Sequence, residues 1–281
     1  MAQLYGRQVT LQLAGVTYIC GGDNGLRCSF NVTKTRDKSL NKASIQLYNP
    51  DTREVLRDVI TQPKLPVRLA AGYDVPRIIF AGFAIKHGVM IDRQAPDRIL
   101  KVLAQSNGGV SSNANVSLSF QGSVSYEQVI NAALDGLGLP RGIIKIPTGS
   151  AFLQGFSYTG NAYELLTRLT DTLGADFTIH DGTLEVLPRT STRLPTGPLY
   201  STELGNIIEA PKPHRAGDKV VQGAIQVTVL MDPSILPGDR FVVQDSSSTF
   251  NGTYKASAVI HKGDSGFSSQ FYTTITGAPY G

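Results

Sequence analysis

The stretch LRCSFNV, residues 26–32, alternates apolar with polar side chains. Successive side chains of a β-strand point to opposite faces, so this alternation predicts a strand with one buried face. The same pattern occurs in VTLQL at residues 9–13 and in ASIQL at residues 43–47. We therefore expect the N-terminal part of the chain to form a β-sheet with one face in a core.

Further strands are predicted on the C-terminal side of these three. The apolar run IIFAGFAI at residues 78–85 predicts one, after a strand through Val67 and Leu69 that reaches a turn at Gly72. The other predicted strands cover residues 89–92, 99–105, 219–231, 240–245, 252–261 and 270–276, with turns at Pro237-Gly238 and Asn251-Gly252. Many short strands separated by Gly, Pro and Asn are typical of an antiparallel barrel or sandwich.

The middle of the chain changes from strand to helix periodicity. Ser125 and Gln128 have the spacing of a capping box, and apolar residues follow at helical spacing until Gly138. A second predicted helix begins at Asn161 and ends at Gly174. A hairpin follows, with strands at residues 175–180 and 183–187 around Asp181-Gly182, a pair that suits a type I′ turn.

These patterns predict a mainly β protein with a small α+β module inserted between two antiparallel β-barrels. The polar stretches SNGGVSSNAN and RTSTRLPTGP read as linkers, since they offer few side chains for a core. The expected domains are a β-barrel at residues 1–105, a linker at 106–115, the α+β module at 116–188, a linker at 189–199 and a second β-barrel at 200–281.

Composition and charge favour an ordinary globular protein. Hydrophobic residues make up 41% of the 281 residues, and the formal net charge is +4. The basic residues are scattered, and the densest stretch, KTRDKSLNK at residues 34–42, is predicted to be a solvated loop, with contact to nucleic acid as the less favoured alternative. No apolar run approaches 18 residues and the N-terminus has no signal-peptide pattern, so we expect neither membrane insertion nor export by a cleaved signal.

The sequence contains no motif that supports catalysis or cofactor binding, and we expect no enzymatic activity. Cys20 and Cys28 are predicted to be buried free thiols, because two cysteines without a nearby histidine complete neither a zinc site nor a disulfide framework. The four histidines do not have the spacing of metal ligands; they are His87, His180, His214 and His261. His180 is expected to form hydrogen bonds at the surface. Two carboxylate pairs are weak candidates for acid–base chemistry, namely Asp171 with Asp176 and Asp232 with Asp239. We therefore assign no catalytic, cofactor-binding or metal-binding residues.

Three ordered groups of motifs resemble the baseplate hub proteins of contractile-tailed bacteriophages, the family of the protein D-like and Mu-like tail hubs. The first group pairs residues 26–35 with ASIQLYNP at residues 43–50 and ends at residues 79–83. The second is GFSYTG at residues 155–160, a Leu-rich helix and the hairpin. The third, the most specific, contains VLMDP at residues 229–233, LPGD, GTY and VIHKGD at residues 236–239, 252–254 and 259–264, and FYTTI at residues 271–275. The family often has a tryptophan where this chain has Phe271-Tyr272, and the chain is short for the group.

The resemblance implies a structural role. Hubs of this family are homotrimers with two tail-tube-like barrels in each subunit, so that a ring of six barrels connects a hexameric tail tube to a trimeric central spike. The implied partners are the tail tube, central spike and tape measure proteins, sheath or baseplate wedge proteins, and passing DNA without sequence-specific contacts. The implied location is the tail baseplate of the virion, assembled in the host bacterial cytoplasm, and no cofactor is implied.

Two other classes of function remain open from the sequence. Small β-barrels also bind nucleic acids or glycans through exposed aromatic residues, although most of the 11 Tyr and 11 Phe here lie at predicted core positions. Some tail-tip proteins carry cell-wall hydrolase domains, although no stretch of this chain resembles one. Within the structural class, a tail terminator, a sheath-like adaptor and a secretion-system homologue are alternatives to the hub.

Overall fold

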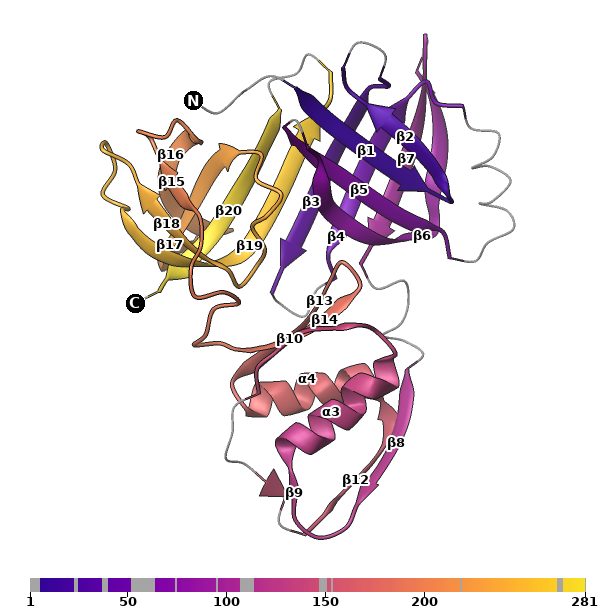
Figure 1. Cartoon of the computed structure of the whole chain (residues 1–281), viewed down its shortest axis with the longest axis vertical. Helices are drawn as coiled ribbons and strands as arrows, with labels where there is room; N and C mark the ends of the chain where they lie inside the picture. Colours follow the sequence, from indigo (N-terminus) through magenta and orange to yellow (C-terminus); the bar gives the residue numbers. More distant parts are fainter. Residues whose placement is uncertain are drawn as a thin grey trace.

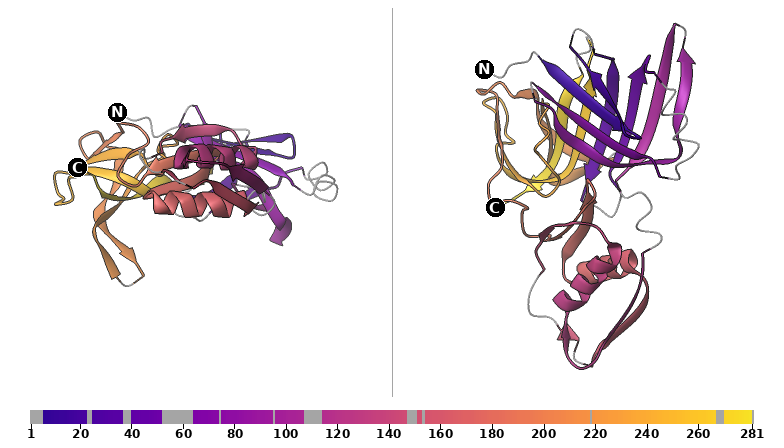
Figure 2. Two further views of the ribbon diagram at one scale, coloured as in Figure 1. Left: turned by 90° about the horizontal axis from the view of Figure 1, so that it is seen from below. Right: turned by 45° about the vertical axis from the view of Figure 1, so that its right-hand side comes forward.

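The computed structural model describes residues 6–22, 25–36, 40–51, 64–73, 75–94, 96–106, 114–146, 151–152, 154–217, 219–266 and 270–280. Two β-barrels lie side by side, and an α+β module projects from one end of the pair (Figure 1). The right-hand view of Figure 2 also shows the module below the barrels, and the left-hand view, from below, looks onto its two helices. The fold class predicted from the sequence is confirmed.

The described residues of the first barrel form seven strands, and its core is made of the inward-facing side chains of each strand. An isolated bridge between Cys20 and Leu26 brings the end of β2 to the segment just before β3. The alternation expected here is confirmed, because Cys28, Phe30 and Val32 are buried; the strand begins two residues later than expected and runs on to Thr35. The strands are β1 (Arg7–Leu13), β2 (Val16–Cys20), β3 (Cys28–Thr35), β4 (Lys42–Tyr48), β5 (Pro66–Tyr73), β6 (Arg77–Gln94) and β7 (Asp97–Gln105).

Two local predictions for the first barrel are wrong. Gly72 is not in a turn but lies within β5, paired with Gln8 of β1. The two strands expected at residues 78–85 and 89–92 are one long strand, β6, whose pairing with β7 shifts register between Ala84 and Val89. His87 in this irregular segment has a φ of 60°, a left-handed conformation that is typical of a bulge. The bulge interrupts the periodicity without ending the strand.

The second barrel contains six strands around a separate core. That core includes Phe241, Tyr254, Val259 and Ile275, all buried. The short strand β15 pairs with β18 in parallel, while the other pairs are antiparallel. The strands are β15 (Leu199–Ser201), β16 (Ile207–Ala216), β17 (Lys219–Leu230), β18 (Arg240–Gln244), β19 (Gly252–Asp264) and β20 (Phe271–Pro279).

Strand β19 joins the two barrels into one thirteen-stranded sheet. Its N-terminal part pairs with β18, and its C-terminal part pairs with β3 of the first barrel, from Ala258 opposite Thr35 to Asp264 opposite Ser29. The guanidinium of Arg27 donates to both carboxylate oxygens of Asp264, at 2.8–3.3 Å. Backbone pairing and a bidentate ion pair together hold the barrels in a fixed relative orientation.

The α+β module packs two helices against short strands. Both helices begin where the sequence predicted: the Ser125 side chain accepts from the amide of Gln128, and the Asn161 side chain accepts from the amides of Tyr163 and Glu164. No helix in the described part of the chain is both long and apolar enough to span a bilayer. The elements are β8 (Asn115–Phe120), β9 (Val124–Ser125), α3 (Tyr126–Leu137), β10 (Arg141–Ile144), β11 (Ala151–Phe152), β12 (Phe156–Asn161), α4 (Ala162–Thr172), β13 (Ala175–His180) and β14 (Thr183–Pro188).

Candidate functional site

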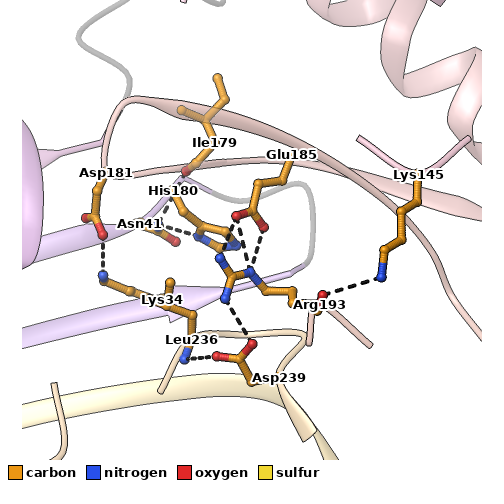
Figure 3. A network of polar contacts seen from close by, with 10 residues as sticks. All are labelled: Lys34, Asn41, Lys145, Ile179, His180, Asp181, Glu185, Arg193, Leu236 and Asp239. Carbon is orange, nitrogen blue, oxygen red and sulfur yellow. Dashed lines mark hydrogen bonds and ion pairs between the residues drawn. The ribbon is translucent and has the colours of Figure 1, made fainter. Parts of the chain in front are cut away.

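The most unusual chemistry of the molecule lies where the α+β module meets the two barrels (Figure 3). Polar and charged side chains converge there from β3 and the segment after it, the β13–β14 hairpin, the segment between β14 and β15, and the residue before β18. Most of them have little access to solvent. We call this set the charged junction; it consists of Lys34, Arg36, Asn41, Asp176, His180, Asp181, Glu185, Arg193 and Asp239.

Lys34 is the most deeply buried charge of the junction. Its side chain is 0% exposed, and its Nζ lies 2.6 Å from Oδ2 of Asp181. The other oxygen of Asp181 accepts from the amide of Ala81 in β6, at 3.0 Å. The segment from Lys34 was expected to be a solvated loop, and this expectation is wrong for its first residues. The reason is that β3 extends to Thr35, and the tip of the β13–β14 hairpin docks against its end (Figure 1).

Arg193 connects the module with the second barrel. Its guanidinium donates to both oxygens of Glu185 in β14, at 2.8–3.2 Å, and to Oδ1 of Asp239 at 2.9 Å. Asp239 also accepts from the amide of Leu236 at 2.8 Å. Burial raises the pKa of Asp239, although the charge of Arg193 acts in the opposite direction. The stretch predicted as a polar linker therefore contains a side chain that clamps two units together.

His180 does not have the surface role that the sequence suggested, because only 3% of the residue is exposed. The side-chain amide of Asn41 lies 3.0 Å from Nδ1 of His180 and donates to the carbonyl of Ile179 at 3.3 Å. Burial, followed by the charges of Lys34 and Arg193, lowers the pKa of His180 well below its usual value. The imidazole is therefore neutral at physiological pH, and it adds no charge to a site that already holds three cations.

The structure brings together one of the two suspected carboxylate pairs. Arg189 donates to Oδ1 of Asp171 at 2.7 Å and to Oδ1 of Asp176 at 2.9 Å, and Arg36 lies 3.4 Å from the other oxygen of Asp176. Each carboxylate is thus engaged by a guanidinium, an arrangement typical of a structural ion-pair network. An acid–base pair for hydrolysis requires instead one carboxyl group kept protonated by its surroundings.

The remaining flagged residues occupy separate places. His261 is fully buried in β19, and its Nδ1 lies 3.0 Å from the hydroxyl of Thr273. Asp232 accepts from the hydroxyl of Tyr200 at 2.8 Å, whereas Asp239, its suspected partner, belongs to the charged junction. Both cysteines are buried and free. His87 is exposed in β6, and His214 lies in β16. Within the described ranges, no group of three or more His, Cys, Asp or Glu side chains is arranged to hold a metal ion.

One feature of the sequence indicates the junction. Lys34 continues the inward phase of Cys28, Phe30 and Val32, two residues beyond the last apolar position. A charged residue in phase with a buried face requires a buried partner, since an unpaired charge is costly to desolvate. The identity of that partner is not readable from sequence, because Asp181 lies 147 residues away.

Comparison with known proteins identifies the fold. No protein-family model matches the chain, and no curated protein sequence matches it either. The tail protein from Neisseria meningitidis MC58 superimposes with a TM-score of 0.68 at 11% identity, covering 97% of this chain and 96% of that one. The 43 kDa tail protein of prophage MuSo2 from Shewanella oneidensis has a TM-score of 0.68 at 10% identity, with 98% of both chains covered.

A third similar structure comes from a secretion apparatus. It is an Escherichia coli component of the type VI secretion system, described as similar to the T4 bacteriophage tail proteins gp27 and gp5. The TM-score is 0.65 at 12% identity, and the match covers 96% of this chain and 77% of that one. Identities this low establish the common architecture alone. The chain has the fold of phage tail proteins, which a type VI secretion component shares.

Proposed function

We propose that this chain is the baseplate hub of a contractile phage tail and has no enzymatic activity. In this proposal, three copies form a ring of six barrels that connects a hexameric tail tube to a trimeric central spike. The ring lines the path of the DNA, which passes without sequence-specific contacts. The ordered hub-like motifs of the sequence and the similarity of the whole chain to two tail proteins support this function.

The observation that carries the proposal is the pairing of β19 with both β18 and β3. One strand pairs with strands of both barrels, so each chain supplies two β units in one hydrogen-bonded sheet. Three such chains around a threefold axis present six units, and a closed ring of this kind satisfies threefold and sixfold partners on its two faces. A chain with one barrel would not solve this symmetry mismatch.

The α+β module supports a second part of the proposal. It projects from one end of the barrel pair (Figure 1), and the charged junction holds it there. We propose that the module faces the sheath or wedge proteins, while the barrels contact the tube, the spike and the tape measure protein. The three expected domains, at residues 1–105, 116–188 and 200–281, are the units of this arrangement.

Imaging of the assembled tail tip tests the function. We expect one ring of three copies between the tube and the spike, with two barrels of each copy in the ring. Light scattering is expected to give three times the chain mass of 30.1 kDa for the purified chain, and that mass plus the mass of a trimeric spike when the spike is present. Finding the chain away from the tube–spike boundary, or with one barrel of each copy in the ring, would contradict the proposal.

A component of a secretion apparatus is the second candidate, and the Escherichia coli structure favours it. The physical role would be similar, since a tube and a spike also meet in such a machine. Mass spectrometry of purified virions separates the two candidates: the hub is a stoichiometric virion protein, whereas a secretion component is absent from particles.

Neither remaining rival is supported by a site. A nucleic-acid or glycan-binding barrel predicts salt-sensitive binding of single-stranded DNA, or binding of oligosaccharides, by the purified chain. A cell-wall hydrolase predicts that Asp171→Asn or Asp176→Asn abolishes clearing of cell walls. In the hub proposal the purified chain shows neither activity.

A further inference from the structure

A pocket of about 620 Å³ opens beside the charged junction, between the α+β module and the second barrel. This volume lies within the range of pockets that hold small ligands or single side chains with their flanking residues. The proposed hub function gives this pocket no role. Its lining consists of Arg36, Asp176, Arg189, Thr190, Lys255, Ala256, Ser257, Ala278, Pro279 and Tyr280.

The pocket has one charged wall and one apolar wall. The charged wall combines Arg36 from the segment after β3 with Asp176 and Arg189 from the module. Strand β20 and the residue after it supply the apolar wall through Ala278, Pro279 and Tyr280, since the methyl of Ala256 is buried in the core of the second barrel. A ligand that fits both walls is therefore amphipathic, with a charged group at one end.

Positive charge exceeds negative charge in the lining. Asp176 is the carboxylate among the lining residues, and it is already engaged by Arg189 at 2.9 Å and by Arg36 at 3.4 Å. Lys255 donates to the backbone carbonyl of Arg189 at 2.7 Å, and among the described residues it forms no ion pair. The charged end of the ligand should therefore be an anion.

The guanidinium of Arg36 has fewer hydrogen-bond acceptors around it than it has donors. Its side chain is 6% exposed, and its two contacts, to Asp176 and to the carbonyl of Leu187, are long at 3.4 and 3.5 Å. Its buried Nη1 has no hydrogen-bond partner among the described residues. This nitrogen packs against Gly238 and is out of reach of a ligand, so Arg36 acts on the pocket through its charge, which its long contacts to Asp176 and Leu187 leave partly uncompensated.

The state of Lys255 agrees with this surplus of positive charge. Burial lowers the pKa of Lys255 to about 8, the charge of Arg36 lowers it further, and the charge of Asp176 opposes both. The charged residues near the amine are Arg36, Asp176, Arg189, whose carbonyl accepts its hydrogen bond, and Arg240, which is opposite Lys255 on β18. A bound anion would favour the protonated amine, so binding should take up protons near neutral pH.

We propose that this pocket binds the carboxylate of a Glu or Asp side chain from a partner protein, with the apolar residues that flank it against Ala278, Pro279 and Tyr280. The amine of Lys255 donates to the carboxylate, and the charge of the Arg36 guanidinium stabilises it. A phosphate of nucleic acid suits the pocket less well, because its sugar and its charged neighbours would face the apolar wall. The bound segment would lie across the boundary between the module and the second barrel.

Titration of the full chain with two short peptides tests the site. The probes are acetyl-Ala-Leu-Glu-Leu-Ala-amide and the same peptide with Gln in place of Glu, followed by NMR or calorimetry. We expect the Glu peptide to bind about 10-fold more tightly than the Gln peptide, the effect of a charge-assisted contact worth about 1.4 kcal/mol. Lys255→Met should weaken the Glu peptide about 5-fold or more, whereas Lys262→Met on the same strand leaves it unchanged.

A second variant separates charge from structural damage. Lys255→Arg keeps the positive charge at all accessible pH values, so it should retain binding. Binding to the unmodified chain should weaken as the pH rises through about 8, and this dependence should be reduced in Lys255→Arg. Equal affinity for the two peptides, unchanged binding in a folded Lys255→Met variant, or displacement of the Glu peptide by a lower concentration of inorganic phosphate would each overturn the proposal.

Discussion

The ammonium of Lys34 and the carboxylate of Asp181 are 2.6 Å apart, although 147 residues separate them in the chain. Asp181 stands at the tip of the β13–β14 hairpin, with a φ of 52° that the type I′ turn requires. The same carboxylate accepts from the amide of Ala81, which lies in a strand that is not next to β3 in the sheet. One turn residue of the module therefore ties together two strands of the first barrel.

Asp181→Asn is expected to destabilise the chain by about 3 kcal/mol. Asn tolerates the left-handed turn conformation, so the hairpin is retained while the buried ammonium loses its counter-charge. Lys34→Met should cost less, because Asp181 is 22% exposed and keeps some access to water. Urea unfolding followed by circular dichroism gives the three free energies of unfolding that this comparison needs.

The double variant and a surface control make the comparison specific. Lys34→Met in the Asp181→Asn background should restore much of the lost stability, since the unpaired buried charge is removed. Asp135→Asn breaks an ion pair with Arg141 whose carboxylate is 74% exposed, and it should change stability by less than about 1 kcal/mol. An Asp181→Asn effect as small as that control would show that the pair does not hold the module.

His261 is expected to make the chain less stable in mild acid. Burial, together with the charge of Lys34, lowers the pKa of His261 from 6.5 to about 3. Its folded-state pKa is depressed, so between those two values the unfolded chain binds more protons, and stability falls as the pH falls from about 6.5 towards about 3. From about pH 7.5 to about pH 5, this single group accounts for about 2 kcal/mol.

Urea unfolding at those two pH values, on the unmodified chain and on His261→Gln, measures this contribution. The variant removes the titration and retains a polar group beside the hydroxyl of Thr273, which lies 3.0 Å from Nδ1 of the histidine. We expect its loss of stability between the two pH values to be about 2 kcal/mol smaller. Equal losses in both proteins would mean that His261 is protonated without cost in the folded chain.

Local sequence patterns predicted elements better than contacts between them. The capping box at Ser125, the Asn161 cap and the Asp181-Gly182 turn each depend on a few neighbouring residues, and all three are present. Strand β16 was missed because Pro211 and Pro213 argue against a strand, yet β16 is at the edge of the sheet, where a missing amide is tolerated. The charged junction was missed because it joins four distant segments.

Gly263→Ala is expected to destabilise the chain at the boundary of the two barrels by about 1–3 kcal/mol. Gly263 of β19 is paired with Phe30 on one side and Phe271 on the other. A Cβ at this position would overlap Cζ of Phe30 and lie 2.9 Å from Cδ2 of Phe271. The two rings contact each other edge to face, with centroids 6.2 Å apart, so neither moves without disturbing the other.

A second substitution tests the cause of that loss. Phe30→Leu removes the ring atom that the new methyl would meet, so its cost should be smaller in the Gly263→Ala background than in the unmodified chain. Free energies from urea unfolding of the four proteins complete a double-mutant cycle. Additive costs would show that the glycine is required for a reason other than the space taken by Phe30.

The two thiols are expected to resist modification in the folded chain. Cys20 and Cys28 are at most 1% exposed, and the hydrogen bond with Cys20, followed by burial, raises the pKa of Cys28 well above its usual value. The thiolate is the reactive form, so both effects slow reaction with Ellman's reagent near pH 8. Ser123→Cys places a thiol at an exposed position, and this thiol should react fully within minutes. Over the same time we expect no release of the coloured product from the unmodified native chain. In urea, both thiols of the unmodified chain should react. Because labelling of the native chain requires opening of the first barrel, its rate should rise in Gly263→Ala by the factor by which the opening equilibrium constant rises, about 10-fold for each 1.4 kcal/mol of lost stability. A rate independent of that substitution would place the opening elsewhere.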